Sequence, residues 1–210
     1  MMEILDFHTH RPDATAAMIS VTPQQFAPQS DRWYSVGFHP WQPLNELIEK
    51  DFELLAQCAR HPQVLAIGET GLDRMYGSDM EIQVAVFIRH LRLASAVGIP
   101  VVVHSVRTAQ DILNERRKAG LTDVTLAVHG MRANPNVART LLEAGCYLSF
   151  GPLFNTDTLH ATPMDRLLIE TDDSTVTIDE VASRIAEALS LSPEEIKKTA
   201  AGNARRLLMR

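Results

Sequence analysis

The stretch VLAIGE at residues 64–69 holds four apolar residues and a glycine, followed by the carboxylate of Glu69. A continuous apolar run of this length is typical of a strand that is buried on both faces, as in a parallel sheet. Similar runs recur along the chain. They predict eight strands, at Glu3–His8, Ala17–Val21, Trp33–Phe38, Val64–Gly68, Pro100–His104, Thr125–His129, Cys146–Phe150 and Arg166–Glu170.

Helical patterns fill the intervals between most of these strands. They predict helices at Leu44–Arg60, Asp79–Val97, Val106–Ala119, Asn136–Ala144, Ile178–Leu189 and Pro193–Leu208. Ser192 and Glu195 are placed to form a capping box for the last helix. Alternating strands and helices predict an α/β fold, a TIM-type (β/α) barrel in one domain over residues 1–210. The interval from His10 to Trp33 is too short for full crossover helices, so we expect the barrel to be trimmed or irregular near the N-terminus.

The composition limits the cellular setting and the substrate. The net charge of -6 gives no general attraction for a polyanion, so a nucleic-acid substrate would need local positive charge, some of it from bound metals. Cys58 and Cys146 lie in predicted element interiors, which fits a reducing cytoplasm. Glu3 and Asp6 argue against a signal peptide, and no apolar run reaches membrane-spanning length. We therefore expect a soluble cytoplasmic protein with no membrane association and no protein partner.

Potential metal ligands stand where the predicted strands end. The C-terminal ends of the strands in a parallel barrel meet at one face, so these side chains should converge on one pocket. Imidazole and carboxylate groups bind zinc, while magnesium or manganese is possible where carboxylates and water dominate. The residues at these ends are His8, His10, His39, Glu69, His104, His129 and Asp172.

The residues of the first and fourth strands each have a structural alternative, and the last strand offers a choice among carboxylates. His8 and His10 are two apart on a strand and point to the same face, where they could bind one cation or form a hydrogen-bonded pair. Glu69 is a candidate bridge between two metals, or a buried partner of a base. We favour Asp172 as a ligand and proton acceptor, with Glu170 structural.

The remaining histidines also allow two interpretations. His104 and His129 each end an apolar run, where a single histidine is more often a hydrogen-bonded core residue. Two histidines at equivalent places on successive strands favour a shared role in binding a metal. His39 could contact substrate or help to transfer protons, or it could pack in its loop beside Pro40 and Trp41.

Taken in order, these segments resemble the TatD family of metal-dependent deoxyribonucleases, over nearly the whole chain. The matching segments are DFHTH at 6–10, GFHP at 37–40, IGETGLD at 67–73, PVVVHS at 100–105, AVHG at 127–130, YLSFG at 147–151, LLIETD at 167–172 and AGNARRLL at 201–208. The resemblance implies a site for two divalent metals. It implies that one metal is surrounded by His8, His10, Glu69 and Asp172, and the other by Glu69, His104 and His129.

The surroundings of these residues depart from the family pattern. Arg107 lies three places after His104, where an arginine usually lies two places after the equivalent histidine. Met131 stands where many members have an aromatic residue, and the chain after Asp172 leads almost directly to the helix at Ile178. These departures leave the metal chemistry intact but remove expected substrate contacts.

The sequence therefore predicts a divalent-metal-dependent hydrolase that cleaves phosphodiester bonds, as a deoxyribonuclease does, with Asp172 and Glu69 catalytic. Together with His39, three arginines in loops past the strand ends are candidate contacts to DNA or to a small phosphoester, although each could be a solvated surface charge: Arg74, Arg107 and Arg132. One alternative keeps the metals but hydrolyses a small phosphomonoester, amide or lactone. A second alternative is a barrel that binds metal without catalysis.

Overall fold

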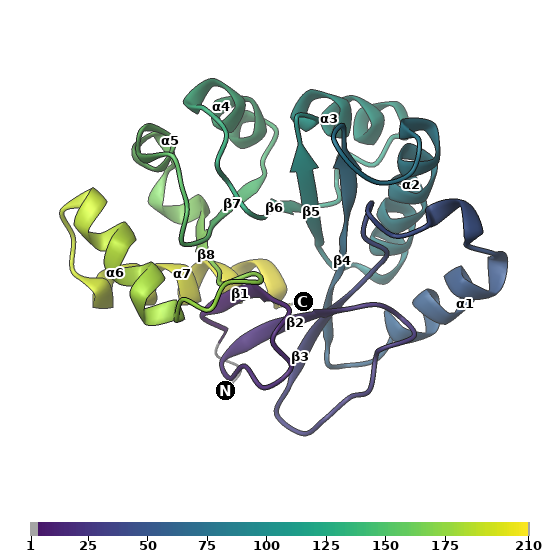
Figure 1. Ribbon diagram of the computed structural model, residues 1–210, viewed down its shortest axis with the longest axis horizontal. Helices are drawn as coiled ribbons and strands as arrows, with labels where there is room; N and C mark the ends of the chain where they lie inside the picture. The colour runs from purple at the N-terminus through teal and green to yellow at the C-terminus, as the bar shows by residue number, and fades with distance from the viewer. Residues whose placement is uncertain (1–3, 210) are drawn as a thin grey trace. The chain divides into compact units, whose positions relative to one another are not determined.

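The computed structural model describes residues 4–209, which hold eight strands and seven α-helices; the two alternate from β3 to α6 (Figure 1). The strands are β1 (Asp6–Thr9), β2 (Ala17–Val21), β3 (Trp33–Val36), β4 (Val64–Asp73), β5 (Val101–Val106), β6 (Leu126–Val128), β7 (Tyr147–Phe150) and β8 (Leu167–Ile169). The helices are α1 (Glu49–Cys58), α2 (Met80–Val97), α3 (Ala109–Lys118), α4 (Pro135–Glu143), α5 (Thr156–Ala161), α6 (Ile178–Leu189) and α7 (Pro193–Leu208), with short 3₁₀ helices η1 (Leu44–Glu46) and η2 (Met164–Arg166). The strands follow one another in the order β1 to β8, which confirms the TIM-type (β/α) barrel.

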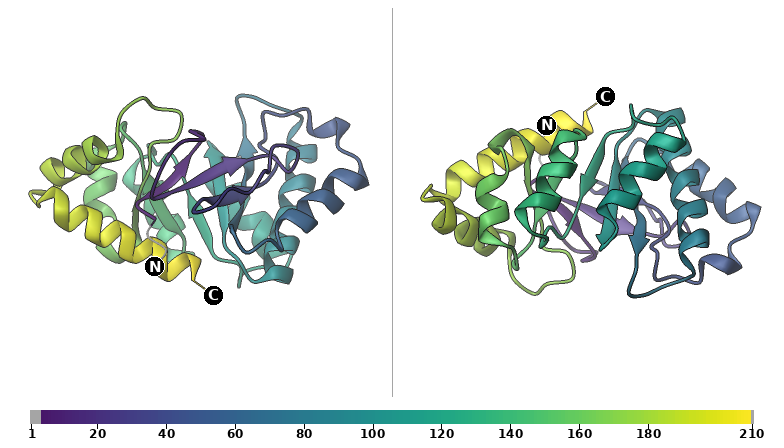
Figure 2. Two further views of the ribbon diagram at one scale, coloured as in Figure 1. Left: turned by 90° about the horizontal axis from the view of Figure 1, so that it is seen from below. Right: turned by 90° about the horizontal axis from the view of Figure 1, so that it is seen from above.

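The chain divides into two compact units, and each is described by itself. The first unit comprises residues 4–19 and 127–209. In it, β7 pairs in parallel with β6 and with β8, and β1 pairs with β8 and β2. Helices α6 and α7 lie side by side in all three views of Figures 1 and 2. The closing helix α7 is fixed to β8 because the Asn203 side-chain amide donates to the carbonyl oxygens of Met164 and Leu167, each at 2.7 Å.

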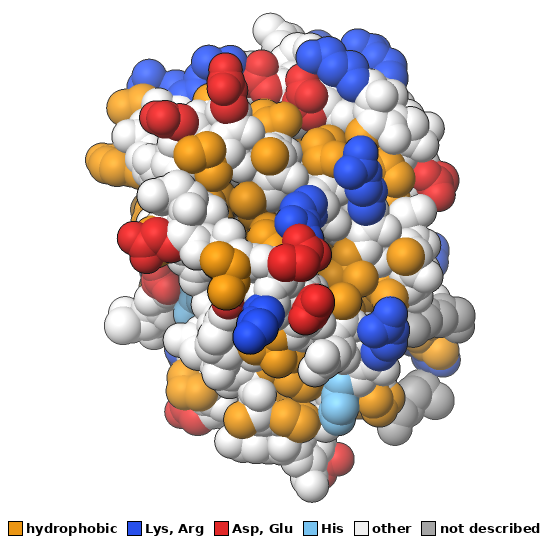
Figure 3. Space-filling model, turned by 90° about the vertical axis from the view of Figure 1, so that its right-hand side faces the viewer, with side chains coloured by type: hydrophobic (Ala, Val, Ile, Leu, Met, Phe, Trp, Pro, Cys, Tyr) orange, Lys and Arg blue, Asp and Glu red, His pale blue; other side chains and the backbone are white. Residues whose placement is uncertain are grey.

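The second unit comprises residues 20–126 and contains β3, β4 and β5 as parallel neighbours. Every residue of β4 is buried, as expected for a strand covered on both faces. The face of this unit that carries α1 and α2 has acidic and basic side chains interspersed, with hydrophobic side chains between them (Figure 3). A mixed surface of this kind provides no continuous field of one sign.

Gly71 of β4 pairs with His104 of β5. A Cβ atom at Gly71 would overlap the carbonyl oxygen of His104, and the φ angle of Gly71 is +150°. Both conditions favour glycine, because it has no Cβ and adopts positive φ at little cost. The glycine therefore lets the two strands approach closely at a residue that the sequence singles out as a ligand.

The observed elements confirm the predicted alternation and correct some of its boundaries. Residues 10–32 are all described, and they hold β2 and loops but no helix, so the barrel is trimmed as expected. Strand β4 was expected to end at Gly68 but continues to Asp73, so Glu69 lies inside the strand. The predicted helix from Leu44 is a 3₁₀ turn followed by α1, while the six-residue helix α5 was not predicted. Ser192 and Glu195 form the expected capping box.

Candidate metal clusters in the two units

The first cluster lies in the first unit, where β1 ends. The Nε2 atoms of His8 and His10 each lie 3.6 Å from Oδ1 of Asp172. His8 is fully buried, whereas the side chains of His10 and Asp172 are 40% and 27% exposed. One nitrogen or oxygen from each residue lies within 4.8 Å of the others, a spacing that could hold a metal ion. The structure thus brings together three of the predicted ligands, and the cluster opens toward solvent at His10.

The backbone of Asp172 is held against β1 in a conformation that few residues adopt. Its φ angle is +54°, in the left-handed region, which aspartate tolerates better than most residues do. The Asp172 N–H donates to the His8 carbonyl at 2.9 Å, and the His10 N–H donates to the Asp172 carbonyl at 3.3 Å. The Thr9 hydroxyl also donates to the Asp172 carbonyl. These bonds fix the carboxylate beside both histidines.

Asp6 of β1 binds Thr171, the residue that precedes Asp172. Its buried carboxylate accepts hydrogen bonds from the Thr171 N–H at 2.9 Å and from the Thr171 hydroxyl at 2.6 Å. Burial raises the pKa of Asp6 to about 6, although the bonds from Thr171 oppose the shift. Asp6 therefore joins the start of β1 to the residue that precedes Asp172.

His129 and Glu170 form a second group with Asp172 in the same unit. Nδ1 of His129 lies 3.5 Å from Oε1 of Glu170, which also accepts a hydrogen bond from the Gly130 N–H at 2.6 Å. Burial alone would raise the pKa of Glu170, but the hydrogen bond and charge of His129 hold it below its usual range. The ring of His129 also lies against that of His8, with centroids 4.3 Å apart.

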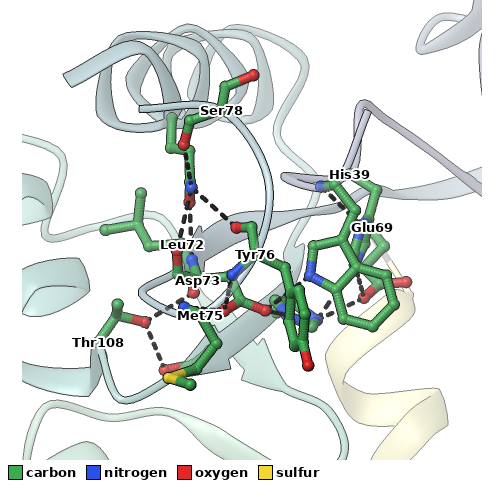
Figure 4. Close-up of polar contacts among 12 residues, drawn as sticks. His39, Glu69, Leu72, Asp73, Met75, Tyr76, Ser78 and Thr108 are labelled. Atoms are coloured by element: carbon green, nitrogen blue, oxygen red, sulfur yellow. Dashed lines mark hydrogen bonds and ion pairs between the residues drawn. The ribbon is translucent and has the colours of Figure 1, made fainter. Parts of the chain in front are cut away.

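The third cluster lies in the second unit and joins His39, Glu69 and His104 (Figure 4). Oε1 of Glu69 lies 3.0 Å from Nε2 of His39 and 3.0 Å from Nδ1 of His104. The two facing ring nitrogens are 3.2 Å apart. Glu69 and His104 are buried, while the His39 side chain is 21% exposed. Lone pairs on nitrogen and oxygen atoms this close together are stabilised by a proton or a cation between them. The two ring nitrogens and the carboxylate oxygen are therefore a set of ligand atoms that fits a metal ion.

Asp73 orients this third cluster, and sequence reasoning missed it. Its Oδ2 accepts hydrogen bonds from Nε2 of His104 at 3.0 Å and from the Trp41 indole N–H at 2.7 Å. Its Oδ1 accepts the backbone N–H groups of Met75 and Tyr76. Burial would raise the pKa of Asp73, but these bonds hold it below its usual range. Because the carboxylate binds the Nε2 hydrogen of His104, Nδ1 is the nitrogen that faces Glu69, as carboxylates orient ligand histidines in metal sites.

The three arginines predicted to contact substrate are not among the residues of the clusters described above. Arg74, Arg107 and Arg132 are exposed. The guanidinium of Arg74 is paired with Asp111 at 2.7 Å and also donates to the carbonyl oxygen of Arg107 at 3.2 Å. A phosphate at Arg74 would therefore replace or share an existing ion pair. The roles of the three arginines stay predictions.

Each predicted ligand thus lies in a cluster within its own unit. The first unit holds His8, His10, His129 and Asp172, and the second holds Glu69 and His104. The expectation that Glu69 bridges two metals stays a prediction, since it would join residues of both units. Glu170 joins a cluster although a structural role was expected for it. Its position two residues before Asp172, on the same side of an extended segment, was the available signal.

Comparison with known proteins identifies the family. Residues 14–209 match the sequence model of the family described as TatD related DNase. The chain belongs to this family. A solved structure of the TatD homologue YJJV from Escherichia coli K12 superposes with a TM-score of 0.84 over 99% of this chain and 98% of that chain, at 22% identity. The two chains therefore share the same fold over nearly all of their residues.

Two curated TatD-family relatives are named uncharacterized metal-dependent hydrolases. YabD of Bacillus subtilis is 29% identical over 94% of this chain and 83% of its own length. YcfH of Escherichia coli K12 is 33% identical over 66% of this chain and 54% of its own length, so the chain spans about half of that relative. The chain is thus a member of a family of metal-dependent hydrolases, and its histidine and carboxylate clusters are compatible with metal binding.

Within residues 4–209, no helix combines the length and the apolar character needed to cross a membrane.

Proposed function

We propose that this TatD-family chain hydrolyses phosphodiester bonds of DNA with two divalent metal ions. The single observation that carries the proposal is the gathering of histidines and carboxylates into clusters in both units. The mouse relative TATDN3, whose name proposes deoxyribonuclease activity, is 28% identical over 82% of this chain. Histidine-rich donor sets favour zinc, while the carboxylates also suit manganese or magnesium.

Some residues of the clusters would bind the metal ions, and one would accept a proton. His8, His10 and Asp172 would hold one ion in the first unit, and Glu69 and His104 would help to hold another. Bound divalent ions would supply an acidified water and neutralise charge on the phosphate. Asp172, partly exposed and held by its backbone, would accept the proton of the attacking water at a carboxylate oxygen.

The proposal is tested with purified Glu69→Ala and Asp172→Ala variants on a DNA oligonucleotide, with added zinc, manganese or magnesium. Asp123→Ala is the matched control, because Asp123 is an exposed carboxylate in the loop before β6. We expect both cluster variants to lose at least about 100-fold in rate while the control keeps its rate and all variants keep their circular dichroism spectra. Metal-dependent cleavage that persists in both variants would refute the assignment.

A small phosphoester is the second candidate substrate. The net charge of -6 and the existing Arg74–Asp111 pair favour a substrate with few phosphate contacts. The salt dependence of cleavage separates the two, because each phosphate contact on DNA releases counterions. A steep fall of kcat/KM with salt supports DNA, whereas rapid, salt-insensitive hydrolysis of a phosphomonoester supports the small substrate.

A further inference from the structure

Trp41 and Tyr76 form an exposed aromatic pair that the metal chemistry leaves unexplained. Their side chains belong to residues that are 56% and 67% exposed, and their ring centroids lie 5.7 Å apart at 69°. The other large exposed hydrophobic residues within 4–209 are aliphatic or methionine, namely Ile48, Met75, Leu153, Met164, Leu191 and Met209. Single exposed apolar residues are ordinary, but two exposed aromatic rings in contact, set at an angle to each other, offer a site where a planar ligand could stack on one ring and touch the edge of the other.

Hydrogen bonds fix the Trp41 side chain and the Tyr76 backbone beside the third cluster. The Trp41 indole N–H donates to Asp73, and the Trp41 backbone N–H donates to Nδ1 of His39 at 3.1 Å. The Trp41 ring lies edge-on to the rings of His39 and His104, with centroids 4.9 and 5.5 Å away. The backbone of Tyr76 is held by the same Asp73 carboxylate, as Figure 4 shows. A rigid aromatic surface loses little conformational entropy when a ligand binds.

Building on the proposed phosphodiester hydrolysis, we propose that Trp41 and Tyr76 form a stacking subsite for a nucleobase of single-stranded DNA. Aromatic side chains stack on bases of any sequence, because every base has a flat π face. In a duplex those faces are covered by neighbouring base pairs, so an exposed aromatic pair selects unpaired bases. The subsite lies beside Glu69 and His104, so a base held there places its own phosphate near the cluster that would act on it.

The arrangement also explains why the rings are not buried. Trp41 could cover apolar surface elsewhere, yet its indole N–H is fixed by Asp73 while the residue stays more than half exposed. Arg74 precedes Met75 and Tyr76 in the same loop and is the nearest cation along the chain. The loop after β4 thus combines an aromatic ring with a guanidinium, two kinds of group that proteins use to bind single-stranded nucleic acid, and a phosphate at Arg74 would share or replace its ion pair with Asp111.

The first experiment compares KM for a short single-stranded DNA with KM for an abasic strand of the same length. We expect Tyr76→Ala to raise the ratio of the KM for the intact strand to the KM for the abasic strand by about tenfold. This is the usual cost of losing one stacked base. Ile48→Ala, which removes an equally exposed apolar side chain of the same unit, should leave this ratio unchanged. Trp41→Phe keeps a ring and should change the ratio less than Tyr76→Ala does. A ratio that does not move in Tyr76→Ala would overturn the subsite.

The second experiment needs no turnover, so it separates this subsite from the proposed hydrolysis. The chain has two tryptophans, and Trp33→Phe leaves Trp41 as the single tryptophan, whose emission is excited selectively over that of the three tyrosines. Deoxyadenosine monophosphate should quench its fluorescence, whereas deoxyribose 5-phosphate should not. Quenching by the nucleotide with no cleavage of any strand would support the subsite and refute the hydrolysis. Equal responses to the two compounds, or none to either, would overturn the subsite whatever the activity.

Discussion

His90 is a fully buried histidine of α2 whose protonation should destabilise the second unit. Its Nε2 accepts the backbone N–H of Phe38 at 3.0 Å, and its Nδ1 hydrogen is donated to the carbonyl oxygen of Val86 at 2.8 Å. Both nitrogens are therefore used by the neutral ring, and the Phe38 bond fixes the residue before His39. Burial lowers the pKa of His90 from 6.5 to about 4, while the bond to Val86 opposes the shift.

The lowered pKa sets the sign and the size of the effect. The unfolded chain takes up a proton near pH 6.5, but the folded chain does so only near pH 4, so stability falls as the pH falls through this window. Above pH 6.5 the contribution of His90 is intact. The full difference corresponds to about 3 kcal/mol, and about 2 kcal/mol of it should be lost between about pH 7.5 and about pH 5.

The assay is urea unfolding at these two pH values, on the native chain and on His90→Gln, whose side chain does not titrate. The other histidines contribute equally to the pH dependence of the free energy of unfolding in both proteins. The difference between the two pH dependences therefore isolates the contribution of His90. His160→Gln, at an exposed position of α5, is the control and should behave as the native chain does. Equal pH dependence in the native chain and His90→Gln would refute the reasoning, as would an NMR titration that shows His90 protonated near pH 6.

Two further predictions concern the β4–β5 contact. Asp73→Asn should weaken zinc binding by about 10–100-fold, because His104 loses the carboxylate that orients it. Titration calorimetry with zinc measures the affinity, and an unchanged affinity would contradict the role given to Asp73. Gly71→Ala should cost about 3 kcal/mol or more in the free energy of unfolding, because its Cβ would overlap the backbone of His104. Gly120→Ala, where φ is +71° but space is open, should cost only about 1 kcal/mol, and equal urea midpoints for the two variants would be inconsistent with this account.

The strands were predictable because the buried strands of a parallel barrel are continuous apolar runs. The last apolar residue of each run indicates roughly where the strand ends. The run before Glu69 shows both the strength and the limit of that signal. It identified the strand and a candidate ligand, but the strand continues to Asp73 through Thr70 and Gly71, neither of which has a large apolar side chain. Here pairing with β5, rather than local hydrophobicity, extends the strand. The short helix α5 was missed for a similar reason, since six residues give too little periodicity to detect.

The candidate ligands were predictable as residue types at strand ends, whereas their partners were not. His104 could be singled out because it ends an apolar run, but its partner Asp73 lies 31 residues earlier in the sequence. Nothing local distinguishes Asp73 from a surface carboxylate, because its role depends on the register between β4 and β5. Glu170 lies two residues before Asp172 and was expected to be structural, yet its contacts with His129 and Gly130 place it in a cluster.

The position of Asp73 has a consequence for how the site could change its substrate. One carboxylate holds His104, which faces the candidate metal position, and Trp41, which faces solvent. Replacing Trp41 by a residue without a donor would leave one carboxylate oxygen with fewer partners and shift its interaction with His104. Tyr76 contacts the same carboxylate only through its backbone, so its side chain can vary without that effect. Substrate preference should therefore change more readily at Tyr76 than at Trp41, even though both rings belong to one surface.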